Sequence, residues 1–258
     1  RRQRQMCIRD RYIYKAVAGV CSLMLLMSSC ESFLSEEPKD FLSPENLPNT
    51  EAECNMLLMG SLSYWRSNNF ERHINFIAEA TTDAVVSATA NNVARDEMNS
   101  LTWQSDNESL YKPWQQFYAC INASNIMIEK VPNASKVSDE VKTRYVAAAR
   151  YMRAMSYFYL VRIFNDVIYL DTPVNDFTSA NNMTKTPAKE IYNKIVEDLE
   201  YAEANLPVKW DSGTERPTVA AAKSLLSWVY ITMAGEQVKD NTMWAKAASK
   251  AKEVIDNA

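Results

Sequence analysis

The chain has 258 residues, 47% of them hydrophobic, with only 4 Gly, 9 Pro and one His. This length suits one large domain or two small ones, and the shortage of Gly beside abundant Ala, Leu, Met and Glu favours helix. The single His73 argues against a His-rich metal site, and the sequence contains no phosphate-binding Gly loop, Cys-x-x-Cys, Gly-x-Ser-x-Gly or His-Glu-x-x-His motif. We therefore predict no metal, no cofactor and no enzyme activity.

The first 29 residues have the pattern of a targeting segment. Residues 1–11 are basic and patternless and are interpreted as a non-native leader. Residues 12–29 combine a basic start, a short apolar run and small residues, which predicts a lipoprotein signal peptide too short to span a bilayer comfortably. Met27 to Cys30 is similar to a bacterial lipobox, so we expect lipidation at Cys30. An ordinary cleaved signal with a chance Cys is the alternative.

Removal of this segment makes the chain more acidic. Residues 1–29 carry six of the 28 basic residues and one of the 32 acidic ones, which leaves 22 basic and 31 acidic residues and a net charge of −9. This balance argues against nucleic-acid binding, because phosphates require clustered Lys and Arg. Cys54 and Cys120 also remain; in an exported protein they could form a disulfide, whereas their apolar helical context favours buried thiols.

The first part of the remaining chain is predicted to be only partly regular. Residues 30–49 are polar, contain three Pro and lack periodicity, which indicates a tether. Thr50 and Glu53 form a capping box that opens a helix. Residues 64–105 are predicted to be irregular and loop-rich, and the small polar residues within 87–100 are expected to form a loop.

Helical patterns dominate the rest of the chain, and residues 50–258 are predicted to form one incomplete helical domain. The expected helices are bounded by Pro113 and Val131, Ser138 and Phe164, Thr186-Pro187 and Pro207, Thr218 and Gly235, and Asn241 and the end of the chain. These elements predict an all-α fold in which antiparallel helical hairpins are plausible. A strict 34-residue repeat is absent from the spacing.

The central helix is the element that the others are expected to surround. It begins at the N-cap Ser138, continues without Gly or Pro to Phe164, and is apolar around most of its circumference. Such a helix requires neighbours on several sides, so we interpret it as scaffold. Arg153 falls in its apolar part, and we expect it to pair with a carboxylate such as Asp198, because a buried Arg must be paired.

Aromatic rings alternate with hydrogen-bonding side chains in the predicted irregular segment. Sugars rest their C–H faces on aromatic rings, and their hydroxyls need amide, carboxylate or guanidinium partners. The candidate ligand-binding residues are Tyr64, Trp65, Arg66, Asn68, Asn69, Asp83 and Trp103. The alternative is that Trp65 and Trp103 are core residues that pin this segment to the helices, and that the amides are ordinary loop residues.

Seven short motifs, in order, resemble the N-terminal half of the SusD/RagB family of outer-membrane glycan-binding lipoproteins. They are Cys30 with Glu31–Pro38, Glu79–Asp83, Tyr111–Trp114 with Ile121 and Asn125, Ala147–Ala154, Tyr157–Val161, Ile191–Ala202, and Arg216–Thr218 with Ala221–Leu226. The chain departs from the family where residues 165–170 lack a Gly-containing turn, and where Glu215 replaces the Gly before Arg216. No ligand-binding residue carries over by motif.

This resemblance implies a truncated member with tetratricopeptide-like helical hairpins, lipid-anchored in the outer membrane and exposed at the cell surface. It implies a protein that captures oligosaccharides and delivers them to a TonB-dependent, SusC-like transporter, without catalysis. Two alternatives stay open: a helical-repeat scaffold that binds only protein, and a peptide-capturing member of the same family.

Overall fold

The computed structural model describes residues 48–85, 92–174, 183–211, 213 and 216–256, apart from the side chains of residues 68–71. The predicted leader, signal peptide and Cys30, and nearly all of the predicted tether, lie outside the described residues. None of the helices in the described ranges combines the length and the apolar character that a membrane span requires.

The regular secondary structure of the described residues is almost entirely helical. The helices are α3 (Glu51–Trp65), α4 (Asn68–Glu79), α5 (Val93–Ser100), α6 (Glu108–Lys130), the short 3₁₀ turn η1 (Val131–Asn133), α7 (Asp139–Phe164), α8 (Ala188–Asn205), α9 (Val219–Ala234) and α10 (Met243–Asp256). A single isolated antiparallel bridge in these ranges joins Val167 to Thr186. The predicted all-α fold is confirmed.

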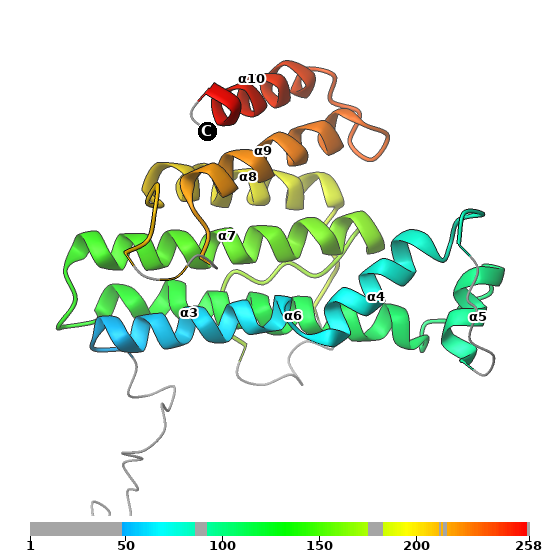
Figure 1. The fold of residues 1–258 in the computed structure, drawn as a ribbon, viewed down its shortest axis with the longest axis horizontal. Helices are drawn as coiled ribbons and strands as arrows, with labels where there is room; N and C mark the ends of the chain where they lie inside the picture. Colours follow the sequence, from blue (N-terminus) through cyan, green and yellow to red (C-terminus); the bar gives the residue numbers. More distant parts are fainter. Residues whose placement is uncertain (1–47, 86–91, 175–182, 212, 214–215, 257–258) are drawn as a thin grey trace, which may run out of the picture. The chain divides into compact units, whose positions relative to one another are not determined.

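The helices pack in chain order as successive hairpins (Figure 1). The long helix α7 lies between α6 and α8, α9 packs on α8, and α10 packs on α9. On the other side of α7, helices α3 and α4 pack against α6. The central helix therefore has neighbours on several sides, as its nearly all-round apolar surface predicts.

Small residues allow these neighbours to approach α7 closely. Ala147, Ala148 and Ala149 are completely buried, in a core cluster that includes residues of α3, α6 and α9. Towards the other end of α7, a second core cluster contains larger side chains such as Tyr157 and Phe158, which pack with residues of α6, α8 and α9. One helix thus supports two separate sections of the core.

The predicted N-caps are correct for α3, α7 and α9, and the predicted starts are wrong for α6, α8 and α10. Helix α6 begins at Glu108, before Pro113, and α10 begins at Met243, beyond Asn241. The Thr50–Glu53 capping box is present, and Ser138 and Thr218 cap α7 and α9 through their hydroxyls. Helix α8 begins at Ala188, one residue later than predicted, with Pro187 at the N-cap position. The Asp166 carboxylate, just beyond α7, accepts the Ala188 N–H at 2.9 Å and supplies the cap. Long-range capping of this kind leaves no local sequence pattern.

The prediction of an irregular segment at 64–105 is wrong for most of the part that is described. Helix α3 continues to Trp65, α4 fills Asn68–Glu79, and α5 occupies Val93–Ser100, where a loop was expected. The Asn92 side chain accepts the Arg95 N–H at 3.1 Å and starts α5, and burial of Met98 fixes its inner face. An N-cap Asn followed by polar residues resembles a loop in sequence, because the same residue types favour both. Residues 86–91 lie outside the described part.

The predicted pairing of Arg153 with Asp198 is confirmed. The guanidinium donates two hydrogen bonds of 2.8 Å to the Asp198 carboxylate, and both side chains are less than a tenth exposed. A third bond of 2.8 Å goes to the side-chain oxygen of Asn125 on α6. The Asn125 amide in turn donates to the carbonyls of Leu170 and Thr172, each at 3.0 Å. This network joins α6, α7, α8 and the segment that follows α7.

Cys54 and Cys120 are buried free thiols, so they do not form a disulfide with each other. Burial raises the pKa of the Cys54 thiol to about 11 and also raises the pKa of Cys120. Both thiols are therefore protonated at neutral pH and serve as small apolar groups.

Candidate functional site

A groove lies at the C-terminal end of α7, where five helices approach one another. Its volume is about 670 Å³, and its walls come from α4, α5, the start of α6, α7 and α9. We call it the aromatic groove because four of its lining side chains are aromatic: Trp103, Tyr159, Phe164 and Trp228. Its aliphatic lining consists mainly of Ile74, Ile77, Met98, Leu110 and Ile163.

Two tryptophans of the groove keep a large part of their surface open to solvent. Trp103, between α5 and α6, is 38% exposed, and Trp228 on α9 is 42% exposed. The ring of Trp228 is held by edge contacts, with ring centroids 5.2 Å from Phe158 and 6.1 Å from Tyr159. Because Phe158 is fully buried, this indole is fixed by the core while remaining accessible.

Arg162 is the charged residue of the groove. It is exposed on the last turns of α7, and its guanidinium carbon lies 4.7 Å from the Trp228 ring centroid and 5.1 Å from that of Phe158. Burial raises the pKa of the neighbouring Tyr159 phenol, although the Arg162 charge opposes this rise. The phenol therefore stays neutral and can both donate and accept hydrogen bonds.

Of the predicted site residues whose side chains the structure describes, Trp103 alone lines the groove. The ring of Trp65 packs inward, 5.7 Å from Phe117 and 5.1 Å from Tyr159, so the alternative of a core role accounts for it. Tyr64 is half-buried near the end of α3 and Arg66 is exposed at its C-cap.

Of the remaining predicted residues, only Asp83 has a described side chain, and it does not line the groove. Asp83 is exposed in the turn that follows α4. Asn68 and Asn69 form the start of α4, and their side chains lie outside the described part of the molecule. The acidic member of the predicted set therefore lies apart from the aromatic groove.

Sequence analysis missed the contributions of α7 and α9. Tyr159 and Arg162 lie on the central helix, which was interpreted as scaffold, and Trp228 was not among the candidate binding residues. The sequence gives one weak indication of a binding role for Trp228, because this residue lies beside the apolar stripe formed by Leu225 and Val229. In the structure its ring is only partly buried. Only the packing of α9 across α8 places it near α4 and α5.

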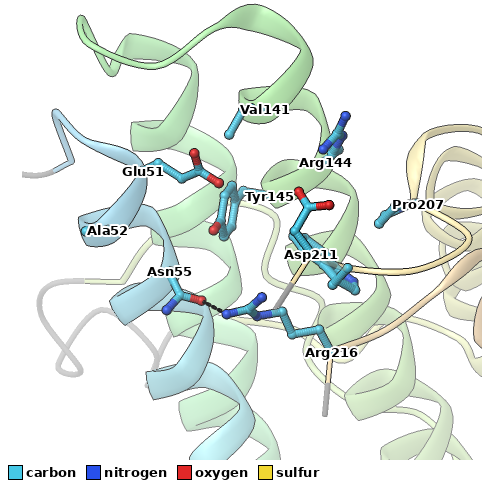
Figure 2. Close-up of a pocket in the computed structure, with 10 residues that line it drawn as sticks. Glu51, Ala52, Asn55, Val141, Arg144, Tyr145, Pro207, Asp211 and Arg216 are labelled. Carbon is cyan, nitrogen blue, oxygen red and sulfur yellow. Dashed lines mark hydrogen bonds between the residues drawn. The ribbon is translucent and has the colours of Figure 1, made fainter. Parts of the chain in front are cut away.

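A second, polar pocket occurs near the other end of α7 (Figure 2). It has a volume of about 210 Å³. Side chains of both charges line it, including Glu51, Arg144, Asp211 and Arg216. By helix rise alone it lies roughly 25 Å from the aromatic groove along α7.

In this second pocket the Arg216-Pro-Thr motif has a structural role, because its side chains and backbone join the segment before α9 to α3 and Trp210. Arg216 donates a 2.7 Å hydrogen bond to Asn55 on α3 and stacks 5.3 Å from the Trp210 ring (Figure 2). The Trp210 indole donates to the Pro217 carbonyl at 2.7 Å. Since Trp210 is only 8% exposed and Tyr145 3%, the pocket offers no open aromatic face. The aromatic groove is therefore the stronger candidate site.

His73 lies beside the groove and gives a test of how α4 is packed. Its Nδ1 is 3.3 Å from the Ser109 hydroxyl of α6, and burial, followed by the charges of Lys112, Arg72 and Arg95, lowers its pKa from 6.5 to about 4.

We expect this shift to make stability depend on pH. The unfolded chain binds the His73 proton more readily than the folded one, so the contribution is complete above pH 6.5 and is lost as pH falls towards about 4. Urea unfolding across this range should show a shallower decline for His73→Asn than for the native chain. Identical slopes for the two proteins would contradict the placement of His73.

A domain of packed helical hairpins that leaves an aromatic groove at one end has the architecture of a helical binding protein. Residues 32–231 match a SusD-like family described as starch-binding and associating with the outer membrane. The chain therefore belongs to the SusD-like family, and the predicted resemblance is confirmed.

Individual relatives agree with this assignment. The chain is 33% identical over 241 residues to SusD-like protein P2 of Formosa agariphila, covering 91% of this chain and 45% of that protein. The fold is similar to a SusD homolog from Bacteroides thetaiotaomicron, with a TM-score of 0.72, 24% identity, and coverage of 83% and 42% of the two chains. It is also similar to a laminarin-binding SusD-like protein, with a TM-score of 0.70, 24% identity, and coverage of 80% and 44%. The chain spans less than half the length of each of these proteins.

Proposed function

We propose that this protein captures oligosaccharides in the aromatic groove. The observation that carries the proposal is the pair of accessible indoles, Trp103 and Trp228, that line one groove in a member of the SusD-like family. The groove volume falls within the range of about 300–1,000 Å³ that is usual for small-ligand sites. A glycan class of ligand is also supported by the laminarin binding of one protein with a similar fold.

The chemistry of the groove suits sugar rings. The C–H face of a pyranose packs against an indole, which excludes water from both apolar surfaces. Tyr159 and Arg162 lie next to Trp228 and supply hydrogen-bonding groups beside it. Because Trp228 is held against the buried Phe158, little conformational entropy is lost when a sugar stacks on it.

The proposal extends to location and partner. We propose that Cys30 is lipidated, that the protein is held at the cell surface on the outer membrane, and that it delivers its ligand to a TonB-dependent transporter. The family description as outer-membrane-associated supports the location, and the family match begins at residue 32, just after Cys30. Metabolic labelling with a fatty acid should mark the native chain but not Cys30→Ser, and a β-barrel transporter should co-purify only with the anchored form.

Tryptophan substitutions provide the test of glycan capture. Trp228→Ala and Trp103→Ala are each expected to weaken oligosaccharide binding by about tenfold, the size of effect expected when one aromatic contact is lost. Calorimetry against a panel of oligosaccharides would measure this.

The matched control is Trp244→Ala. Trp244 is 51% exposed on α10 and does not line the groove, so its removal should leave binding unchanged. Titration with peptides in parallel tests the two alternatives. Binding of peptides without any binding of sugars would favour the peptide-capturing alternative, and inertness to both would favour the protein-binding scaffold.

A further inference from the structure

The described residues that line the aromatic groove carry positive charge and no negative charge. Among the described residues that line it, Arg162 is the only charged one, and no carboxylate or side-chain amide is present. The side-chain acceptors are the hydroxyls of Thr81 and Tyr159, and Thr81 already donates its proton to the Ile77 carbonyl at 2.9 Å. A neutral sugar needs acceptors for several hydroxyl protons, and this groove supplies few of them.

Arg162 is available to bind an anion. It forms no ion pair with any acidic side chain in the described ranges. Its guanidinium carbon lies over the Trp228 ring, 4.7 Å from the ring centroid. The N–H donors of a guanidinium point outward in its plane, where they match the two oxygens of a carboxylate or sulfate.

Neighbouring helices add positive charge on the same side of the molecule. Arg72, Arg95 and Lys112 are close enough to His73, next to the groove residue Ile74, to lower the His73 pKa. Lys112 is paired with Glu108, and Arg95 lies 4.5 Å from the Phe76 ring. Acidic residues of the same helices, among them Glu79, Asp96 and Glu108, offset these charges, so Arg162 is the residue that sets the charge of the groove lining itself.

We infer that the aromatic groove selects anionic glycans, sugars that carry a carboxylate or a sulfate ester. The anionic substituent binds the Arg162 guanidinium, and the apolar face of the same or the adjacent ring packs on Trp228. This inference rests on the proposed capture of oligosaccharides and specifies its ligand class.

The experiment compares pairs of oligosaccharides that differ in charge alone. One pair is an oligogalacturonide and its fully methyl-esterified form, and the other is a sulfated galactan oligosaccharide and its desulfated form. In calorimetry with the full chain, the anionic member of at least one pair should bind about tenfold more tightly than its neutral counterpart, the size of effect expected for a charge-assisted bidentate contact. The two pairs separate carboxylate from sulfate recognition.

Substitutions at Arg162 assign the preference to this residue. Arg162→Gln should reduce the ratio of anionic to neutral affinity to about one, and Arg162→Lys should keep part of this ratio, since Lys retains charge but not the planar fork. The control is Arg144→Gln, an arginine on the same helix that lines the other pocket. Circular dichroism would verify that each variant is folded.

The possible outcomes separate the two proposals. Equal affinity for charged and neutral members, unaffected by Arg162→Gln, overturns the anionic-glycan inference and leaves glycan capture intact. Absence of binding to any glycan overturns both. A preference that decreases with added salt and disappears in Arg162→Gln supports the inference, because exposed charge contacts are screened by salt.

Discussion

Replacing Arg153 with Met is expected to lower the free energy of unfolding by about 3–5 kcal/mol, because the change leaves the buried carboxylate of Asp198 without its partner. Asp198 accepts both of its 2.8 Å bonds from this guanidinium and is 4% exposed. Arg150 lies 3.7 Å from the same carboxylate and recovers part of the lost attraction, which favours the lower end of this range. The Asn125 oxygen also loses its donor.

Urea unfolding measures the effect, and two further variants define its origin. Lys194→Met removes an exposed i,i+3 pair with Glu197 and should cost less than about 1 kcal/mol. The double variant Arg153→Met, Asp198→Leu removes both charges and should recover most of the stability lost by the single change. A single variant as stable as the native chain, or a double variant less stable than the single one, would show that the pair is not desolvated as described.

The Arg153–Asp198 pair also shows what the sequence was able to predict. An Arg in the apolar part of a long helix requires a partner, and Asp198 was the acid at a suitable place on the next predicted helix. The capping box at Thr50 and the cap at Ser138 were predictable for the same reason, since each depends on residues no more than four apart. Local rules and the demand that buried charge be paired were enough for most of the scaffold.

The groove could not be predicted in this way. Its walls come from segments as distant as Ile74 and Trp228, and nothing local to either residue indicates the other. Trp103 was found because an aromatic residue in a polar segment is conspicuous. Trp65 satisfies the same criterion but turns inward onto Phe117. The direction of each ring depends on how α3, α5 and α6 pack, which is a tertiary property.

Replacing Phe158 with Ala is expected to lower the free energy of unfolding by about 3–5 kcal/mol, the usual cost of removing a buried aromatic ring. Phe158 is fully buried, with ring centroids 6.4 Å from Tyr192 and 5.2 Å from Trp228. The same ring lies beneath Arg162 at 5.1 Å. It therefore supports both the aromatic and the cationic parts of the groove from inside the core.

This position predicts a second effect that a purely structural residue would not produce. In Phe158→Ala, the remaining folded protein should bind oligosaccharides more weakly, because Trp228 and Arg162 lose the surface that holds them in place. Leu160→Ala is the matched control: Leu160 is also fully buried on α7, should cost about 2–5 kcal/mol, and does not line the groove. Calorimetry at a temperature where both variants are folded distinguishes the two. Equal glycan affinity for Phe158→Ala and Leu160→Ala would mean that the indole is positioned by α9 alone, and that the core beneath the groove contributes stability without shaping the site.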